Sequence, residues 1–428
     1  MRELNDQAVL RAALIDARRR MLALYDHLAP AQLQVPHLKV VNPPLWERAH
    51  VGWFQEYWCV RRRGSGEPLR SRLPDSDPML NSAIIPHAER WNLPRLTRES
   101  VFDYLHREFD DTLQALERST PGSRYFFALS LFHEDMHAEA MLMTLQTLAL
   151  PAPPAPQEPI PRPDPAPAAG DVAFEGGEFE MGSREGPDFV FDNELHAHRV
   201  RVAPFALAAV AVTNAEYLAF VEADGYAREA LWSPQGWRWR AEAGATAPCY
   251  WRRGAGRWLA RRFDRWEPLC AEDPVMHVNA HEAEAYCRFA GRRLPSEAEW
   301  EFAARADLDP ALDRFPWGAG VLAQGAVNLD AVYAAPVPAA ALPGCDSRRG
   351  VRQMIGNVWE WTATPFAPYP GFAPGPYREY SEPWFNSHRV LRGGCFATRA
   401  RLVHNRWRNF YTPERNDVFA GFRTAVSL

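Results

Sequence analysis

The chain has 428 residues, of which 47% are hydrophobic and 24% charged, and its formal net charge is −5. This composition is that of a globular protein large enough for two or three domains, each with its own core. The small negative charge, without a dominant basic patch, predicts no nucleic-acid partner. No apolar run approaches the roughly 20 residues that span a bilayer, so no membrane partner is expected.

The six cysteines are scattered along the chain without a Cys-x-x-Cys pair, which indicates neither a disulfide framework nor a zinc knuckle. The first 28 residues carry charges every few positions and lack the uninterrupted apolar core of a signal peptide. Both observations favour a reducing compartment, and we expect a cytoplasmic protein. They leave the oligomeric state open.

Residues 1–150 show apolar positions recurring at intervals of three and four, which predicts a four-helix bundle. The expected helices cover residues 9–28, 45–62, 98–118 and 124–150. The connection between the second and third helices is long and carries Arg90 and Arg95. Connections of this length are often functional, so Arg90 is a candidate substrate contact, and the role of Arg95 stays open.

The fourth expected helix carries His133 and His137, which are four residues apart and therefore share one face. Two neutral imidazoles on successive turns can bind one divalent metal, and a third ligand from another helix leaves coordination positions open for chemistry. His50, on the second expected helix, is the candidate third ligand. Histidines at this spacing are also common in surface and structural roles, so the spacing alone leaves both interpretations open.

Residues 151–170 contain nine prolines and cannot form a helix or a central strand. This segment is predicted to be a semi-extended linker between a domain at 1–150 and another at 171–428. After the linker the pattern changes to short β-like runs, including an expected hairpin at 174–183 and an expected strand at 198–205. Helices are expected at 214–223, 279–290 and 296–305, with Thr213, Asn279 and Ser296 as their caps.

A set of motifs follows the linker in order: Gly-Gly-Glu-Phe-Glu-Met-Gly-Ser at 176–183, Arg-Arg-Leu-Pro-Ser-Glu-Ala-Glu-Trp-Glu at 292–301, Gly-Asn-Val-Trp-Glu-Trp at 356–361, Leu-Arg-Gly-Gly-Cys-Phe at 391–396 and Gly-Phe-Arg at 421–423. Together they resemble the formylglycine-generating-enzyme (sulfatase-modifying factor) domain, which is similar to the C-type lectin fold. The helical half resembles a DinB-like bundle. The expected fold class is therefore α+β, a DinB-like four-helix bundle followed by a loop-rich, C-type-lectin-like domain.

This pairing of domains resembles the ergothioneine-type sulfoxide synthases. These are non-haem iron(II) oxidoreductases that use O₂ to join a sulfur or selenium donor to the imidazole C2 of hercynine, the trimethylbetaine of histidine. The resemblance implies an Fe(II) site at His50, His133 and His137. The family's catalytic tyrosine, a proton or electron donor, falls most naturally on Tyr377, with Tyr380 as the second choice.

The resemblance also implies substrate contacts near the C-terminus. Asn409 is expected to hold the hercynine carboxylate, and Phe410 offers an aromatic face to its quaternary ammonium group, which is held through cation–π contact. A buried loop asparagine and a core phenylalanine are the structural alternative for these two residues.

Two positions depart from the family pattern. Tyr411 stands where members that use γ-glutamylcysteine carry an aspartate. Met136 stands where a glutamine commonly precedes the last iron histidine, and the loss of that polar contact is expected to change how hercynine or the donor binds there. Tyrosine is a frequent partner of sugars, so the expected donor is a selenosugar, 1-seleno-β-D-glucose, and a C–Se bond forms. The alternative donor is γ-glutamylcysteine or cysteine, in agreement with Arg415, whose charge can meet a donor carboxylate.

Three other functions are weighed against this one. A formylglycine-generating activity needs a cysteine pair shortly after the Arg-Gly-Gly motif, and residues 397–408 contain no cysteine, so Cys395 is interpreted as a packing residue. A zinc-dependent thiol transferase does not need the second domain. A lectin-like binding module does not need three converging histidines.

Overall fold

The computed structural model describes residues 2–62, 67–93, 96–154, 160–168, 170–186, 188–320 and 322–428. The chain divides into two compact units, Met1–Pro154 with Gly186–Phe189 and Ala155–Glu185 with Val190–Leu428. The first is helical and the second combines helices with small sheets, so the expected α+β class is confirmed. Among the described residues, no helix has the length and apolarity needed to cross a bilayer.

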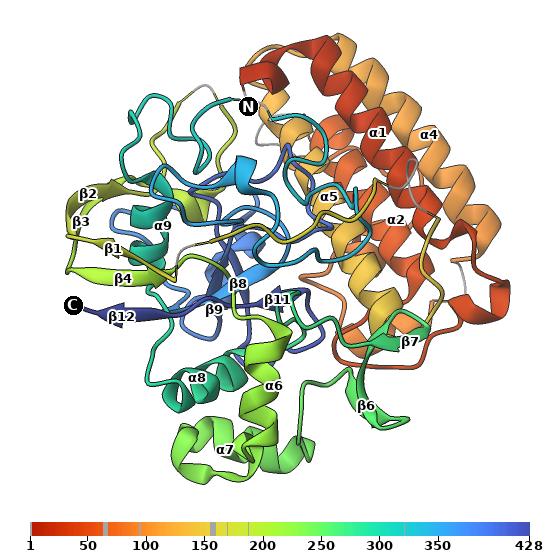
Figure 1. The fold of residues 1–428 in the computed structure, drawn as a ribbon. Coiled ribbons are helices and arrows are strands. Elements are labelled where there is room, and N and C mark those ends of the chain that lie inside the picture. The colour runs from red at the N-terminus through yellow and green to blue at the C-terminus, as the bar shows by residue number, and fades with distance from the viewer. Residues whose placement is uncertain are drawn as a thin grey trace. The chain divides into compact units, whose positions relative to one another are not determined.

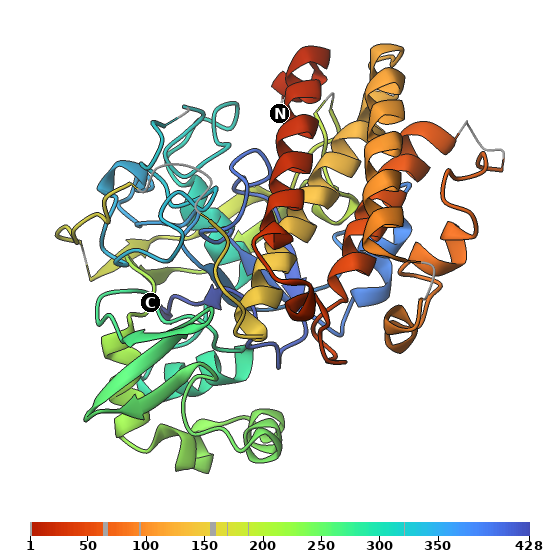
Figure 2. The same cartoon turned by 90° about the vertical axis from the view of Figure 1, so that its right-hand side faces the viewer.

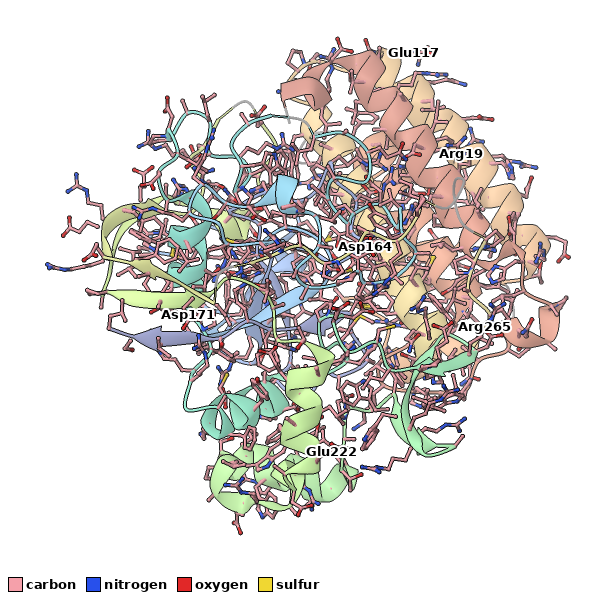
Figure 3. All side chains as sticks on the ribbon, in the orientation of Figure 1. Arg19, Glu117, Asp164, Asp171, Glu222 and Arg265 are labelled. Atoms are coloured by element: carbon pink, nitrogen blue, oxygen red, sulfur yellow. The ribbon has the colours of Figure 1, made fainter. Side chains whose placement is uncertain are left out.

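The first unit is built on four long helices that lie alongside one another (Figures 1 and 2). They are α1 Gln7–Asp26, α2 Pro44–Gln55, α4 Arg98–Glu117 and α5 Arg124–Thr147. Helix α1 packs against α5, and α2 packs against both α4 and α5. Apolar residues three and four positions apart, such as Leu10, Leu14 and Met21, are fully buried. Charged side chains such as Arg19 and Glu117 lie on the outer faces (Figure 3).

The second predicted helix is not α-helical throughout. Helix α2 ends at Gln55 and continues as a π-helix, η3 Glu56–Arg61. A π turn rotates the following side chains relative to an α-helix and often marks a functional region. Here it accompanies an inward-facing carboxylate, because Glu56 is 1% exposed and accepts a 2.8 Å hydrogen bond from the Tyr104 hydroxyl.

The long connection between α2 and α4 holds a short helix, α3 Ser76–Leu80, and a 3₁₀ turn, η4 His87–Trp91. Two further 3₁₀ turns, η1 Arg2–Asn5 and η2 Pro30–Leu33, flank α1. The expectation about Arg95 falls outside the described residues.

The second unit contains small sheets rather than one continuous sheet. One has the strand order β1–β4–β12, and another has the order β10–β9–β8–β11, in which β8 and β11 are parallel. Strands β2 and β3 form a pair, and β5, β6 and β7 form an antiparallel sheet. The strands are β1 Asp171–Phe174, β2 Gly177–Met181, β3 His198–Val202, β4 Phe205–Ala208, β5 Trp251–Gly254, β6 Arg257–Arg262, β7 Arg265–Pro268, β8 Trp359–Pro365, β9 Arg389–Arg392, β10 Asn409–Tyr411, β11 Ala420–Gly421 and β12 Ala425–Ser427.

The predicted helices of this unit are confirmed together with their caps. They are α6 Asn214–Glu222, α8 Ala280–Phe289 and α9 Glu297–Arg305, and a further helix, α7 Pro234–Ala243, was not predicted. Thr213, Asn279 and Ser296 each accept a hydrogen bond from the backbone N–H three residues later. Side-chain capping of these otherwise unpaired donors is visible in sequence because it needs only local residues.

Two strand predictions were wrong. The segment 174–183 is not a hairpin, because β1 pairs with β4 while β2 pairs with β3. The chain passes between the sheets at Gly176, where φ is 69° and a Cβ atom would lie 2.3 Å from the Val202 carbonyl oxygen. The expected strand 198–205 is divided into β3 and β4 at Pro204, which has no N–H for a strand ladder.

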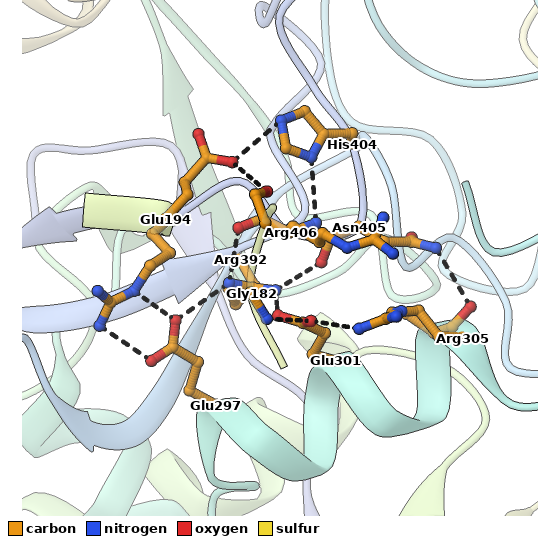
Figure 4. A network of polar contacts seen from close by, with 12 residues as sticks. Gly182, Glu194, Glu297, Glu301, Arg305, Arg392, His404, Asn405 and Arg406 are labelled. Carbon is orange, nitrogen blue, oxygen red and sulfur yellow. Dashed lines mark hydrogen bonds and ion pairs between the residues drawn. The ribbon is translucent and has the colours of Figure 1, made fainter. Parts of the chain in front are cut away.

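A buried ionic network joins α9 to the sheet that carries β10. Arg392, on β9, contacts Glu297 at 3.0 Å and Glu301 at 2.7 Å (Figure 4), and Arg408 contacts Glu297 at 2.8 Å. All four side chains are at most 2% exposed, so each charge depends on its partners for compensation. Removal of one member would leave buried charges unpaired, and the network therefore holds the segment before β10 in place.

The described part of the proline-rich segment is hydrogen-bonded to the second unit. The Ala166 N–H donates to the Ala340 carbonyl at 3.0 Å, and Arg162 donates to the Pro336 carbonyl at 3.0 Å. Arg352 donates to the Ala166 carbonyl at 3.1 Å. Residues 160–168 form neither helix nor strand, as predicted, but they are attached to the domain that follows and are not a free spacer.

Candidate metal centre and substrate-binding residues

The bundle brings His50, His133 and His137 together. His50 projects from α2, and the other two project from adjacent turns of α5. One ring nitrogen from each histidine lies within 4.8 Å of the others, and the ring centroids are 4.5 to 5.0 Å apart. Three imidazoles in this arrangement are a ready ligand set for one divalent metal.

The Nδ1 atoms of His50 and His137 are both hydrogen-bonded. His50 Nδ1 lies 2.6 Å from the Leu80 carbonyl oxygen, at the end of α3, and His137 Nδ1 lies 2.9 Å from Glu47 Oε1. Both partners are acceptors, so each Nδ1 carries the proton and each Nε2 presents its lone pair. Such partners orient metal-binding histidines and fix their tautomers.

Aromatic rings hold the two buried histidines. The His133 ring stacks on Phe54 with centroids 3.7 Å apart, and the His50 ring stacks on Trp46 at 4.8 Å. His50 is 2% exposed and His133 is 4% exposed. Burial, and then the neighbouring His137, lower the pKa of both imidazoles well below the usual value, so they are neutral, as metal ligands must be.

These residues fit a resident metal. The donor set is three imidazole nitrogens, and three protein ligands leave coordination positions for substrate or oxygen. A set of imidazoles suits zinc and iron equally, so the ligands alone do not choose between them.

Arg90 lies in the same unit as the histidines and is joined to them through Trp46. Its guanidinium carbon is 4.2 Å from the centre of the Trp46 ring, and the His50 ring stacks on the same Trp46 at 4.8 Å. Arg90 also donates to Asn42 Oδ1 at 2.8 Å. Met136 is half-buried on α5, directly before His137. The substrate-contact roles of Arg90 and Met136 remain predictions.

The two candidate tyrosines lie in the second unit, where Tyr377 directly precedes one turn, η9 Arg378–Tyr380, and Tyr380 ends it. Their ring centroids are 6.1 Å apart, and both side chains are half-buried. Tyr380 stacks on Phe191 at 4.5 Å and meets the Phe410 ring edge-on at 5.7 Å. The structure therefore brings Tyr380 beside a predicted substrate-binding residue.

The tyrosine turn is anchored by residues that the sequence analysis missed. The Ser381 hydroxyl donates to Asp192 Oδ1 at 2.5 Å, and the Gly375 N–H donates to Asp192 Oδ2 at 3.0 Å. Asn193 Nδ2 donates to Ser381 Oγ at 3.1 Å. The signal available in the sequence was the Asp-Asn-Glu run that follows an aromatic segment at 189–191, but its partners are almost 190 residues away.

Asn409, Phe410 and Tyr411 make up β10, which pairs with β9. The Phe410 ring stacks on Phe366 with centroids 3.9 Å apart, and Asn409 Oδ1 accepts a 2.8 Å hydrogen bond from the Phe410 N–H. All three residues are partly exposed, which leaves surface for a ligand.

Arg415 lies over the Tyr411 ring, with its guanidinium carbon 5.1 Å from the ring centre. It also donates to both carboxylate oxygens of Asp417, at 2.5 and 2.7 Å. The charge of Arg415 thus has a partner within the chain. Tyr411, Arg415 and Asp417 form one contact group in the second unit, whereas the histidines belong to the first.

Cys395 is fully buried and accepts a 3.5 Å hydrogen bond from the Thr398 hydroxyl. The packing role predicted for this cysteine agrees with that environment. A formylglycine-generating activity needs a cysteine pair after the Arg-Gly-Gly motif, and this chain has no cysteine at 397–408.

Comparisons with known proteins agree with both halves of the fold. Residues 157–428 match the sulfatase-modifying factor enzyme 1-like domain, and residues 13–145 match the DinB superfamily. A hercynine oxygenase from Mycolicibacterium thermoresistibile is 36% identical over 431 residues, covering 98% of this chain and 95% of that protein. One from Mycolicibacterium smegmatis is 37% identical over 421 residues, covering 96% of each chain. A formylglycine-generating enzyme from Streptomyces coelicolor is 33% identical over 308 residues, covering 61% of this chain and 92% of that protein.

A DinB-type bundle with three converging histidines, followed by a sulfatase-modifying-factor domain without its cysteine pair, defines a two-domain oxidative enzyme. The similarity extends over nearly the whole length of the full-length relatives. The chain belongs to the hercynine oxygenase family.

Proposed function

We propose that this enzyme uses O₂ to join a sulfur or selenium donor to C2 of the hercynine imidazole at an iron(II) centre held by His50, His133 and His137. The observation that carries the proposal is the three-histidine cluster, with two Nδ1 atoms already engaged, in a member of the hercynine oxygenase family. Iron(II) bound there would supply the one-electron chemistry with O₂ that zinc cannot provide.

With a thiol donor the overall reaction balances as one oxidative coupling. The hercynine C2–H and the donor S–H are lost, a C–S bond forms, one oxygen atom of O₂ ends on sulfur as a sulfoxide, and the other leaves as water. The protein must bind two organic substrates and deliver a proton during oxygen reduction. The family resemblance assigns residues of this chain to both tasks.

Asn409 and Phe410 are the residues we assign to hercynine. The side-chain amide of Asn409 can donate hydrogen bonds to a carboxylate, and the Phe410 ring can hold a trimethylammonium group, which has no hydrogen to donate. The Phe366 ring behind Phe410 keeps this aromatic surface in one orientation.

A tyrosine of the η9 turn, Tyr377 or Tyr380, is assigned as the proton donor. Burial, and then the charge of Glu194, raise the pKa of Tyr380 well above its usual value, so that phenol remains protonated at neutral pH. Tyr377 remains our first choice because it occupies the position expected from the family resemblance.

Of the two donor classes, we propose the sulfur donor ahead of the selenosugar. The relatives carry the name hercynine oxygenase, which fits a hercynine sulfoxide synthase that uses γ-glutamylcysteine or cysteine. This supports the alternative donor of the sequence analysis better than the selenosugar.

One specific observation favours the second candidate, a selenoneine synthase that takes 1-seleno-β-D-glucose. Tyr411 carries no charge to answer a γ-glutamyl ammonium, and the charge of Arg415 is already paired with Asp417. A neutral donor with hydroxyl groups needs neither charge. The two candidates share the metal centre and the hercynine-binding residues and differ only at this contact group.

The test is a competition under O₂ with hercynine and equal concentrations of γ-glutamylcysteine, cysteine and 1-selenoglucose, using protein loaded anaerobically with iron(II). A C–S or C–Se product at C2 of hercynine supports the shared function, and the ratio of products identifies the donor. Iron-loaded protein that couples no donor to hercynine would overturn the proposed function.

A further inference from the structure

Glu47 stands out among the buried carboxylates of the bundle. It lies on α2, three residues before His50, and is 1% exposed. Its Oε1 atom accepts the hydrogen bond from His137 Nδ1 at 2.9 Å. The corresponding acceptor for His50 is a neutral carbonyl, that of Leu80. His137 therefore has an anionic hydrogen-bond partner, whereas the partner of His50 is neutral.

Only one oxygen of the Glu47 carboxylate has a direct partner, although the Arg90 guanidinium interacts with this carboxylate electrostatically. The Oε2 atom of Glu47 is buried and has no hydrogen-bond partner among the described residues. Glu47 forms an ion pair with His137, which carries charge only when protonated. A buried carboxylate needs a countercharge, and a dication bound through His137 supplies one.

His137 is also the ligand that most needs orientation. His50 and His133 are enclosed and stack on Trp46 and Phe54, whereas 21% of the His137 side chain is exposed. A partly exposed imidazole can rotate and exchange tautomers, and an anionic acceptor at Nδ1 suppresses both motions.

We propose that Glu47 is a positioning residue of the metal centre: its carboxylate holds His137 with Nε2 directed to the metal and makes that imidazole a stronger ligand. The proposal rests on the metal site of the proposed function and adds a residue that determines metal affinity. Glu47 acts through His137 and does not touch the metal.

The test compares Glu47→Gln, Glu47→Ala and a control, Glu56→Gln. Glu56 is equally buried in the same unit, but its partners are Tyr104, Ser71 and Arg72, so the control removes a similar buried charge away from the histidines. Affinity for Co²⁺, a stand-in for Fe²⁺ that is stable in air, is measured by competition with a chelator. The visible spectrum of the bound cobalt reports ligand geometry.

We expect Glu47→Ala to weaken Co²⁺ binding by about 10- to 100-fold, the usual effect of removing such a partner. Glu47→Gln should weaken it less, because the amide oxygen still accepts the hydrogen bond, but should shift the cobalt spectrum through the lost charge. Glu56→Gln should leave both unchanged. Melting curves of the metal-free variants establish that each one folds.

Failure of this proposal is distinct from failure of the proposed function. If the wild type binds one Co²⁺ and both Glu47 variants bind it with unchanged affinity and spectrum, Glu47 has no positioning role although the metal centre stands. Equal weakening in Glu56→Gln would also overturn the proposal, since the effect would then belong to any buried charge. If the wild type binds no metal, the proposed function itself fails.

Discussion

Arg415 and Asp417 form a bidentate ion pair, with Nε 2.5 Å from Oδ1 and Nη2 2.7 Å from Oδ2. The same guanidinium covers the Tyr411 ring. An arginine whose Nε–Nη2 edge already holds a carboxylate has less capacity to bind a donor carboxylate. The contact group therefore offers a ring and a hydroxyl from Tyr411 in place of free charge, and this arrangement yields a prediction about the donor.

Replacement of Tyr411 with aspartate should shift the enzyme toward γ-glutamylcysteine. A carboxylate at this position can pair with the γ-glutamyl ammonium, and such a contact is worth about 10- to 100-fold in relative kcat/KM. The measurement is the kcat/KM ratio for γ-glutamylcysteine over 1-selenoglucose. Tyr411→Phe, which keeps the ring without adding charge, is the matched control. An unchanged ratio in Tyr411→Asp would mean that Tyr411 does not contact the donor.

His133→Ala and His137→Ala should each abolish stoichiometric iron and turnover while leaving the fold intact. Two remaining imidazoles hold a divalent metal too weakly to survive purification. Iron content and circular dichroism after anaerobic loading provide the measurements. His106→Ala is the control, since His106 is an exposed histidine on α4. Full iron content in either α5 variant would remove the metal from this helix.

Tyr377→Phe should keep iron and hercynine binding and lower the coupling rate by about 100-fold or more, as expected when a proton donor used only during oxygen chemistry is removed. Single-turnover kinetics with O₂ separate that step from binding. Tyr380→Phe is the parallel variant. Should only Tyr380→Phe lose the rate, the catalytic tyrosine is the one beside Phe410 and our assignment is one turn too early.

Glu282 should make stability depend on pH near neutrality. It is fully buried on α8, and burial raises its pKa from 4.5 to about 7. A raised carboxyl pKa favours the protonated form in the folded state. Its contribution is therefore present below the unfolded pKa and is lost as pH rises from 4.5 to about 7.

The size of this effect is at most about 3 to 4 kcal/mol, since each pKa unit corresponds to about 1.4 kcal/mol. Chemical unfolding of the wild type and Glu282→Gln at about pH 5 and about pH 8 measures it. The variant keeps a neutral group at position 282, so it should lose less stability than the wild type between the two pH values. Equal losses would show that Glu282 titrates normally.

The sequence by itself determined the features that depend on local order. The intervals between apolar residues predicted the four bundle helices, and the capping residues Thr213, Asn279 and Ser296 marked three helices of the second unit. The spacing of His133 and His137 placed two ligands on one face because a helix repeats about every 3.6 residues. These signals lie within a few residues of one another, so a pattern in the chain is sufficient to read them.

Only the tertiary structure decided which distant residues meet. The sequence offered His50 as a candidate third ligand, but it meets the other two histidines because α2 packs against α5, and Glu47 reaches His137 across the same contact. Asp192 meets Ser381 from 189 positions away, and β1 pairs with β4 in place of β2. Such contacts form because buried polar groups and strand edges must find partners somewhere in the folded chain. Which residues become partners depends on packing among elements far apart in sequence, and the spacing of neighbouring residues does not predict that packing.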